Sequence, residues 1–148
     1  MTFILAIQLN DSIVVAADNK EVVLKVEETN NFNQRHTLKL HAWDNGIITG
    51  TGESYVINRC IALFKKFAQS ELTSLPDYLE LSRQIREHEI GTDHFQVQNT
   101  KLLCSSYSEQ GAQLYKIEQI NDQQSYTMTA IEPMDITVWM FNPNVKTI

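Results

Sequence analysis

The spacing of apolar residues changes twice along this chain of 148 residues, and the change limits which folds are available to it. Residues 3–52 contain short apolar stretches, several of which alternate with polar residues, as in β-strands. Residues 55–89 instead place apolar side chains every three or four positions, which indicates helices. The strand pattern then returns over residues 101–141. This order predicts an α+β fold with two helices laid on a mainly antiparallel sheet.

The first two strands are predicted over residues 3–9 and 13–17, as an antiparallel pair joined by the turn Asn10-Asp11-Ser12. Side chains on both faces of the first strand are mostly apolar, so we expect it to be buried on two sides. Residues 22–26 alternate apolar with charged side chains and predict a half-exposed strand. Residues 27–36 are polar, and we expect a loop there.

A strong turn signal follows at Asp44-Asn45-Gly46, because Asn-Gly accepts the positive φ angles of a tight hairpin. The signal predicts that residues 37–43 and 47–52 are paired strands. The later strands are predicted over residues 101–107, 112–120, 125–131 and 136–141.

Two helices are predicted over residues 55–68 and 75–89, packed on one face of a sheet. Ser74-x-x-Asp77 resembles a helix start, and proline is tolerated in a first helical turn. Gly91 is a plausible helix end.

Composition indicates one globular domain. The chain is 43% hydrophobic and 20% charged, and 148 residues can bury a real core. Its formal net charge of −6 argues against binding a phosphate backbone as its main function, so no nucleic-acid partner is expected. The apolar run at the N-terminus is too short for a signal peptide or a membrane span. We therefore expect a cytoplasmic protein without a membrane partner.

No metal or other cofactor is expected. Neither Cys60 nor Cys104 has a CxxC partner, and both lie in apolar runs, which predicts buried free thiols in a reducing cytosol. Burial also argues against Cys104 as a nucleophile. A site combining Asp93-His94 with a serine has no support in the sequence. The histidines show no metal-ligand spacing; they are His36, His41, His88 and His94.

Four features occur in an order that is similar to one known family. They are Thr2 at the start of the first strand, VVAAD ending at Asp18, Lys39-Leu40 at a strand start, and Gly50-x-Gly52 just before a helix. Over roughly residues 2–120, this pattern resembles the proteasome β-subunit superfamily, including the bacterial HslV and Anbu proteasome-like proteins.

The resemblance implies an N-terminal nucleophile hydrolase fold, a sandwich of antiparallel sheets with flanking helices, shortened here at the C-terminus. It also implies a threonine peptidase whose mature chain begins at Thr2 after removal of Met1. By position, Thr2 matches the nucleophile, Asp18 the active-site aspartate and Lys39 the catalytic lysine of the family.

The glycines match a further part of the family pattern. Gly52 corresponds best to the glycine whose backbone N–H helps to form the oxyanion hole, and Gly50 is the neighbouring candidate. The same glycines can also serve only to let a strand pack closely.

The implied chemistry is coherent in physical terms. A threonine hydroxyl is a poor nucleophile unless a base lies beside it. The free α-amine of Thr2, with an ordinary pKa of about 7.7–8.0, would supply that base. The ammonium of Lys39 would lower the pKa of this amine further, and Asp18 would keep Lys39 charged and oriented. We therefore expect Lys39 Nζ within hydrogen-bonding distance of Asp18, with both near Thr2 Oγ1.

The resemblance also implies partners. We expect a peptide or unfolded-protein substrate, a homo-oligomer in the form of a ring, and an ATP-dependent unfoldase as a possible partner. Large side chains at Phe64, Phe67 and Trp139 are many for so short a chain, and we expect the helix faces to form the contacts between subunits.

The alternative is a catalytically inactive proteasome-like subunit that serves as a structural or binding module. In that interpretation Thr2 only begins a strand. It is favoured by the sequence AIEPMD, in which Pro133 stands near the position of the serine-glycine loop that supports the amine in the family.

Overall fold

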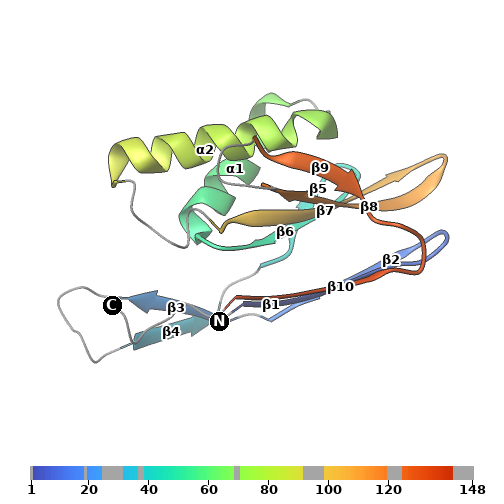
Figure 1. Ribbon diagram of the computed structural model, residues 1–148, viewed down its shortest axis with the longest axis horizontal. Helices are drawn as coiled ribbons and strands as arrows, with labels where there is room; N and C mark the ends of the chain where they lie inside the picture. The colour runs from blue at the N-terminus through green and yellow to red at the C-terminus, as the bar shows by residue number, and fades with distance from the viewer. Residues whose placement is uncertain are drawn as a thin grey trace.

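The computed structural model describes residues 2–18, 20–24, 32–36, 39–68, 71–91, 99–119 and 125–141. Its main body has three layers (Figure 1). Two helices cover one face of a five-stranded antiparallel sheet, here called the large sheet, and a three-stranded antiparallel sheet, the small sheet, lies against its other face. The α+β fold expected from the sequence is confirmed.

The small sheet has β1 (Thr2–Gln8) at its centre, between β2 (Ile13–Ala17) and β10 (Ile136–Phe141). The predicted pairing of the first two strands is confirmed, since β1 and β2 are antiparallel neighbours. β10 runs antiparallel to β1 and brings Phe141 opposite Thr2. The end of the chain described here therefore lies beside the start of the first strand.

A separate two-stranded sheet pairs β3 (Lys20–Leu24) with β4 (Phe32–His36). The expectation of a loop over residues 27–36 is wrong for Phe32–His36, which form a strand. A strand ladder is made by backbone N–H and C=O groups, so a polar segment can pair without the apolar alternation that marks a buried strand.

The large sheet confirms the predicted hairpin, with Asp44 and Asn45 in the turn and Trp43 opposite Gly46. The expected positive φ angles are wrong, because neither Asn45 nor Gly46 has one. Gly46 is required instead by close packing, since a Cβ there would collide with the carbonyl oxygen of Ser105.

The first strand of the large sheet is shorter than expected, because Lys39 and Leu40 precede it. The strand order is β5 (His41–Trp43), β6 (Gly46–Thr51), β7 (Lys101–Ser108), β8 (Gly111–Glu118) and β9 (Thr127–Ala130).

Both predicted helices are present, as α1 (Ser54–Phe67) and α2 (Leu75–Glu89), the second preceded by a short 3₁₀ turn, η1 (Leu72–Ser74). Ser74 does not cap α2 in the expected way, since its hydroxyl donates to the carbonyl of Glu71 at 2.6 Å. No helix in the described segments is long and apolar enough to cross a membrane.

The apolar core has two parts, one on each side of the large sheet. Between this sheet and the helices, Phe64 packs edge-on against Trp43, with ring centroids 5.5 Å apart. Both cysteines are buried in this part, and burial raises the pKa of each thiol to about 12. The expected buried thiols are confirmed, and these thiols stay protonated near neutral pH. The second part, between the two sheets, contains Ile4, Ala6, Leu103, Leu114, Ile131 and Trp139.

A buried glutamine also joins the two sheets. From β1, the Gln8 amide donates to the carbonyl of Ala112 at 2.9 Å, and its oxygen accepts the backbone N–H of Leu114 at 2.7 Å. The strand that begins with Thr2 is thus tied to β8 by polar contacts as well as by apolar packing.

The outward face of the small sheet is apolar but not covered. The expectation that β1 is buried on both sides is wrong, because Phe3 is 41% exposed while its inward neighbour Ile4 is fully buried. Nothing in the described part of the chain packs over this face (Figure 1). Exposed large side chains on the three strands are Phe3, Val14, Ile136, Val138 and Met140.

Candidate functional site

Thr2 is the first residue of β1 and is half-buried, opposite Phe141 of β10. Its position is set by the central place of β1 in the small sheet, with a paired strand on each side. Met1, whose removal the expected chemistry requires, lies outside the described residues.

Asp18 follows β2 directly and is fixed to the residue after Thr2 by two backbone contacts. The N–H of Phe3 donates to Asp18 Oδ1 at 3.2 Å, and the N–H of Asp18 donates to the carbonyl of Phe3 at 3.1 Å. The antiparallel pairing of β1 with β2 therefore places this carboxylate beside the start of β1.

Lys39 comes from a third segment and joins the two. Its Nζ lies 2.7 Å from Asp18 Oδ1 and donates to Thr2 Oγ1 at 3.4 Å. Only 12% of the Lys39 side chain and 28% of the Asp18 side chain are exposed. The geometry expected from the sequence is confirmed for these three side chains, and their catalytic roles stay a prediction.

The contacts define what the cluster can do chemically. An ammonium beside a hydroxyl stabilises negative charge that develops on Thr2 Oγ1, and partial removal from water strengthens this effect. Asp18 accepts from Lys39 and from a backbone N–H, which holds the ammonium toward Thr2 rather than toward solvent. Such a cluster suits a nucleophilic hydroxyl.

Thr49 is a supporting residue that the sequence reasoning missed. It lies buried in β6, and its hydroxyl donates to the carbonyl of Lys39 at 2.7 Å. This bond attaches the backbone of Lys39 to the large sheet. The signal in the sequence is weak, because Thr49 is one of two hydroxyl residues in the otherwise apolar and glycine-rich stretch IITGTG.

Both candidate glycines lie where a side chain would collide with β7 or the residue before it. A Cβ on Gly50 would be 2.6 Å from Leu102 Cδ2 and 2.7 Å from the carbonyl oxygen of Lys101. A Cβ on Gly52 would be 2.5 Å from Thr100 Cα, and Gly52 has a φ of +117°. Close packing therefore requires both glycines, and the oxyanion role of Gly52 stays a prediction.

Replacing Gly52 by alanine is expected to lower the free energy of unfolding by about 1–3 kcal/mol, because the new Cβ meets the backbone of Thr100. Urea unfolding would measure the change. Gly111→Ala is the matched control, since Gly111 also has a positive φ, +102°, but its added Cβ would meet nothing closer than 3.7 Å. Equal losses for the two variants would contradict crowding at Gly52 as the larger cause.

The expected place of Pro133 is wrong. The neighbouring Met134 donates its N–H to the carbonyl of Gln8 at 2.7 Å, and Gln8 is at the opposite end of β1 from Thr2. At about 3.4 Å per residue, the two ends of this strand are about 20 Å apart. Pro133 therefore does not occupy a loop beside the amine of Thr2, and it gives no support to an inactive protein.

The other nucleophiles considered from the sequence gain no support. Cys104 is buried, and its raised pKa keeps the thiol protonated. Asp93-His94 lies outside the described residues. Burial, and then the charge of Lys65, lowers the pKa of His41, which disfavours its charged form at neutral pH.

Comparison with known proteins gives matches in structure but not in sequence. No protein-family model matches the chain, and the search of curated proteins gives no match. A solved structure of an Anbu (Gly-1) mutant from Hyphomicrobium sp. strain MC1 aligns over 97% of this chain with a TM-score of 0.62 and 13% identity. HslV from Trypanosoma brucei aligns over 93% of this chain with a TM-score of 0.50 and 14% identity.

The two alignments cover different shares of the solved chains. The chain spans 61% of the length of the Anbu chain and 71% of the HslV chain. The chain therefore shares its α+β fold with the Anbu and HslV structures, as the resemblance to the proteasome β-subunit superfamily predicts.

Proposed function

We propose that this chain is a threonine-type peptidase of the N-terminal nucleophile class. One observation carries the proposal: Lys39 Nζ lies 2.7 Å from Asp18 Oδ1 and donates to Thr2 Oγ1 at 3.4 Å, at the start of the first strand. Three separate segments of the chain supply a hydroxyl at Thr2, a carboxylate at Asp18 and an ammonium at Lys39, which is the order of these residues in the proteasome-like pattern.

In the proposed reaction, removal of Met1 exposes the α-amine of Thr2. The hydroxyl of Thr2 attacks the carbonyl carbon of a peptide bond while the amine accepts its proton. Lys39 stabilises the charge on Oγ1, and the N–H of Gly52 stabilises the oxyanion. The amine then protonates the leaving nitrogen, which releases one peptide and leaves an ester on Thr2. Water, activated by the same amine, hydrolyses the ester and restores the hydroxyl.

The direct test is hydrolysis of fluorogenic peptides by protein whose N-terminus has been defined by intact-mass spectrometry. A mass that corresponds to a start at Thr2, together with peptide hydrolysis, supports the proposal. Protein that starts at Thr2 and hydrolyses none of a varied set of peptides would contradict it.

The proposed substrate is a peptide or an unfolded protein, since the reaction needs an accessible backbone carbonyl. We place the activity in the cytoplasm, inside a homo-oligomeric ring, with an ATP-dependent unfoldase as a possible partner. The ring is supported by the likeness to the Anbu and HslV folds and by the apolar outward face of the small sheet.

Besides the helix faces expected from the sequence, where Phe67 is exposed, contacts between subunits are expected to use this sheet face. Val138, about half exposed midway along the edge strand β10, tests this assignment. Val138→Lys should convert the oligomer to monomer in light scattering at micromolar concentration, because a charge cannot be buried there without a partner. Lys66→Glu on the exposed side of α1 is the comparison variant on a helix face. An oligomer unaffected by Val138→Lys would show that subunits meet elsewhere.

A catalytically inactive subunit is the second candidate. It is favoured by the uncovered apolar sheet face, which a binding module would use. In that case the protein would oligomerise or bind a relative without hydrolysing peptides, even after Met1 is removed. The peptide assay and light scattering together separate the two candidates.

A further inference from the structure

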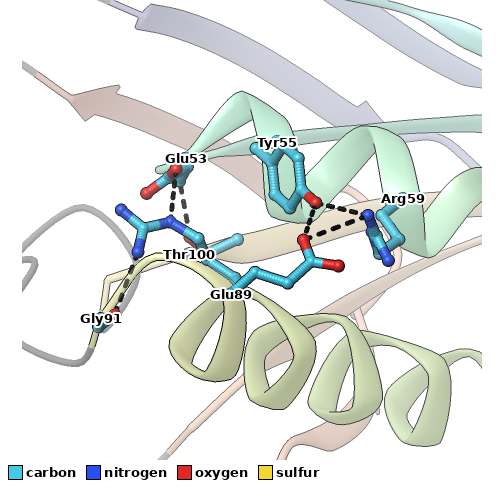
Figure 2. Close-up of polar contacts among 7 residues, drawn as sticks. Glu53, Tyr55, Arg59, Glu89, Gly91 and Thr100 are labelled. Carbon is cyan, nitrogen blue, oxygen red and sulfur yellow. Dashed lines mark hydrogen bonds and ion pairs between the residues drawn. The ribbon is translucent and has the colours of Figure 1, made fainter.

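A second cluster of charged side chains lies at the N-terminus of α1 (Figure 2). Arg86 of α2 is only 4% exposed. Its Nε lies 2.9 Å from Glu53 Oε1, and its Nη1 donates to the carbonyl of Gly91 at 3.0 Å. The guanidinium thus joins the last part of α2 to the residue that precedes α1.

Glu53 is held at its backbone as well as at its side chain. Its N–H donates to Thr100 Oγ1 at 3.0 Å, and its carbonyl accepts the first N–H of the α1 ladder, from Ile57, at 3.1 Å. Thr100 is buried and lies directly before β7. Contacts to three separate elements therefore determine where this one residue lies.

Stability alone does not account for a buried ion pair at this place. Taking two charges out of water costs about as much as their attraction returns, and apolar side chains of similar size are often equally stabilising. Arg83, one turn away on α2, pairs with Glu80 and Glu87 on the more exposed side of the same helix. The buried pair differs from these in that it contacts the segment between β6 and α1.

That segment consists of Gly52 and Glu53. The residue before Gly52 is Thr51, which ends β6 and pairs with Lys101. On the other side, Thr100 and Arg86 hold Glu53. Gly52, with a φ of +117°, is therefore clamped between two fixed residues.

We propose that Arg86 and Glu53 form a positioning pair that fixes the backbone at Gly52. Its consequence for catalysis rests on the proposed function, in which the N–H of Gly52 stabilises the oxyanion. A donor must be held in place before the reaction, because reorientation during the reaction would cost part of the stabilisation. In this proposal the pair acts on catalysis through the position of the Gly52 backbone.

The first test measures the backbone itself, by hydrogen exchange of assigned amides in the full chain. The double variant Glu53→Leu/Arg86→Met removes both charges together, so neither is left buried alone. Thr100→Val removes the hydroxyl that accepts from residue 53 and keeps the shape. Relative to wild type, both variants should lower the protection of amide 53 at least about tenfold, with a shifted Gly52 amide signal.

A matched control comes from the neighbouring contacts of the same two helices. Arg59 and Tyr55 of α1 bond to Glu89 of α2, on the exposed side (Figure 2). Arg59→Met should leave the protection of amide 53 within about twofold of wild type, because Arg59 bonds to the side chains of Tyr55 and Glu89 rather than to the backbone that precedes α1. Equal protection in wild type and in both test variants would overturn the proposal.

The second test is kinetic and separates this inference from the proposed function. With peptide substrates, both test variants should lower kcat at least about tenfold, with KM within about twofold of wild type and little change in Tm. A fall in kcat that only follows a fall in Tm would overturn the catalytic role. Wild-type protein without peptidase activity would refute the proposed function, and the protection of amide 53 would still decide the positioning role.

Discussion

Thr2→Ala is expected to lower kcat/KM for fluorogenic peptides by at least about 100-fold, while the fold stays intact. The variant removes the hydroxyl to which Lys39 Nζ donates and keeps a small residue after Met1. Thr2 is half-buried at the start of β1, and its side chain belongs to neither part of the apolar core. Circular dichroism and urea unfolding should therefore give values close to those of wild type.

Two further threonine variants make the result specific. Thr2→Ser keeps a hydroxyl at the same place and should retain measurable hydrolysis. Thr127→Ala removes an exposed hydroxyl from β9 and should have no effect. If Thr2→Ala hydrolysed peptides as fast as wild type from the same N-terminus, Thr2 would only begin a strand, and the activity would belong to another group.

The secondary structure was predictable wherever one face of an element is buried against the core. The helical period of residues 55–68 and 75–89 corresponds closely to α1 (Ser54–Phe67) and α2 (Leu75–Glu89). The turn signal at Asp44-Asn45-Gly46 located the β5–β6 hairpin, although neither Asn45 nor Gly46 takes the positive φ angle that suggested it. The helical period, by contrast, depends on residues within a few positions of one another in the chain.

Two features of the fold could not be predicted because they depend on distant neighbours. β4 (Phe32–His36) is polar, and its pairing with β3 leaves no trace in the spacing of its side chains. The apolar residues of β1 and β10 predict burial, but whether a layer covers Phe3 and Met140 depends on which other elements exist. In the described part of the chain nothing covers them, and Met140 is 69% exposed.

The residues of the candidate site also form two groups, those that could be predicted from the sequence and those that could not. Thr2, Asp18 and Lys39 could be proposed because each stands at the end or start of a predicted element, where the resemblance supplied the order. Thr49 and Arg86 could not be found, since their partners are a backbone carbonyl and a carboxylate from other elements. The misplacement of Pro133 has the same cause, because only the β1–β10 register shows which loop faces Thr2.

Lys39→Met is expected to lower kcat/KM by about 100-fold or more, comparable with the loss of an oxyanion donor in other hydrolases. Methionine keeps an unbranched side chain that is one atom shorter, and it removes the ammonium that faces Thr2 Oγ1 at 3.4 Å. Asp18 would still accept the N–H of Phe3, so the strand pairing that holds it should persist. The rate should fall without loss of the fold, as peptide kinetics and urea unfolding would measure together.

Arg and Asn variants separate the charge of Lys39 from its position. Lys39→Arg keeps a cation but replaces a compact ammonium by a planar guanidinium, so it should recover only part of the lost rate. Asp18→Asn keeps the shape of the carboxylate and removes the ion pair at 2.7 Å. If Asp18 acts by orienting Lys39, adding Asp18→Asn to Lys39→Met should cost little more than Lys39→Met alone. Losses that multiply in the double variant would show that Asp18 acts on Thr2 independently, and a Lys39→Met variant as active as wild type would remove Lys39 from the mechanism.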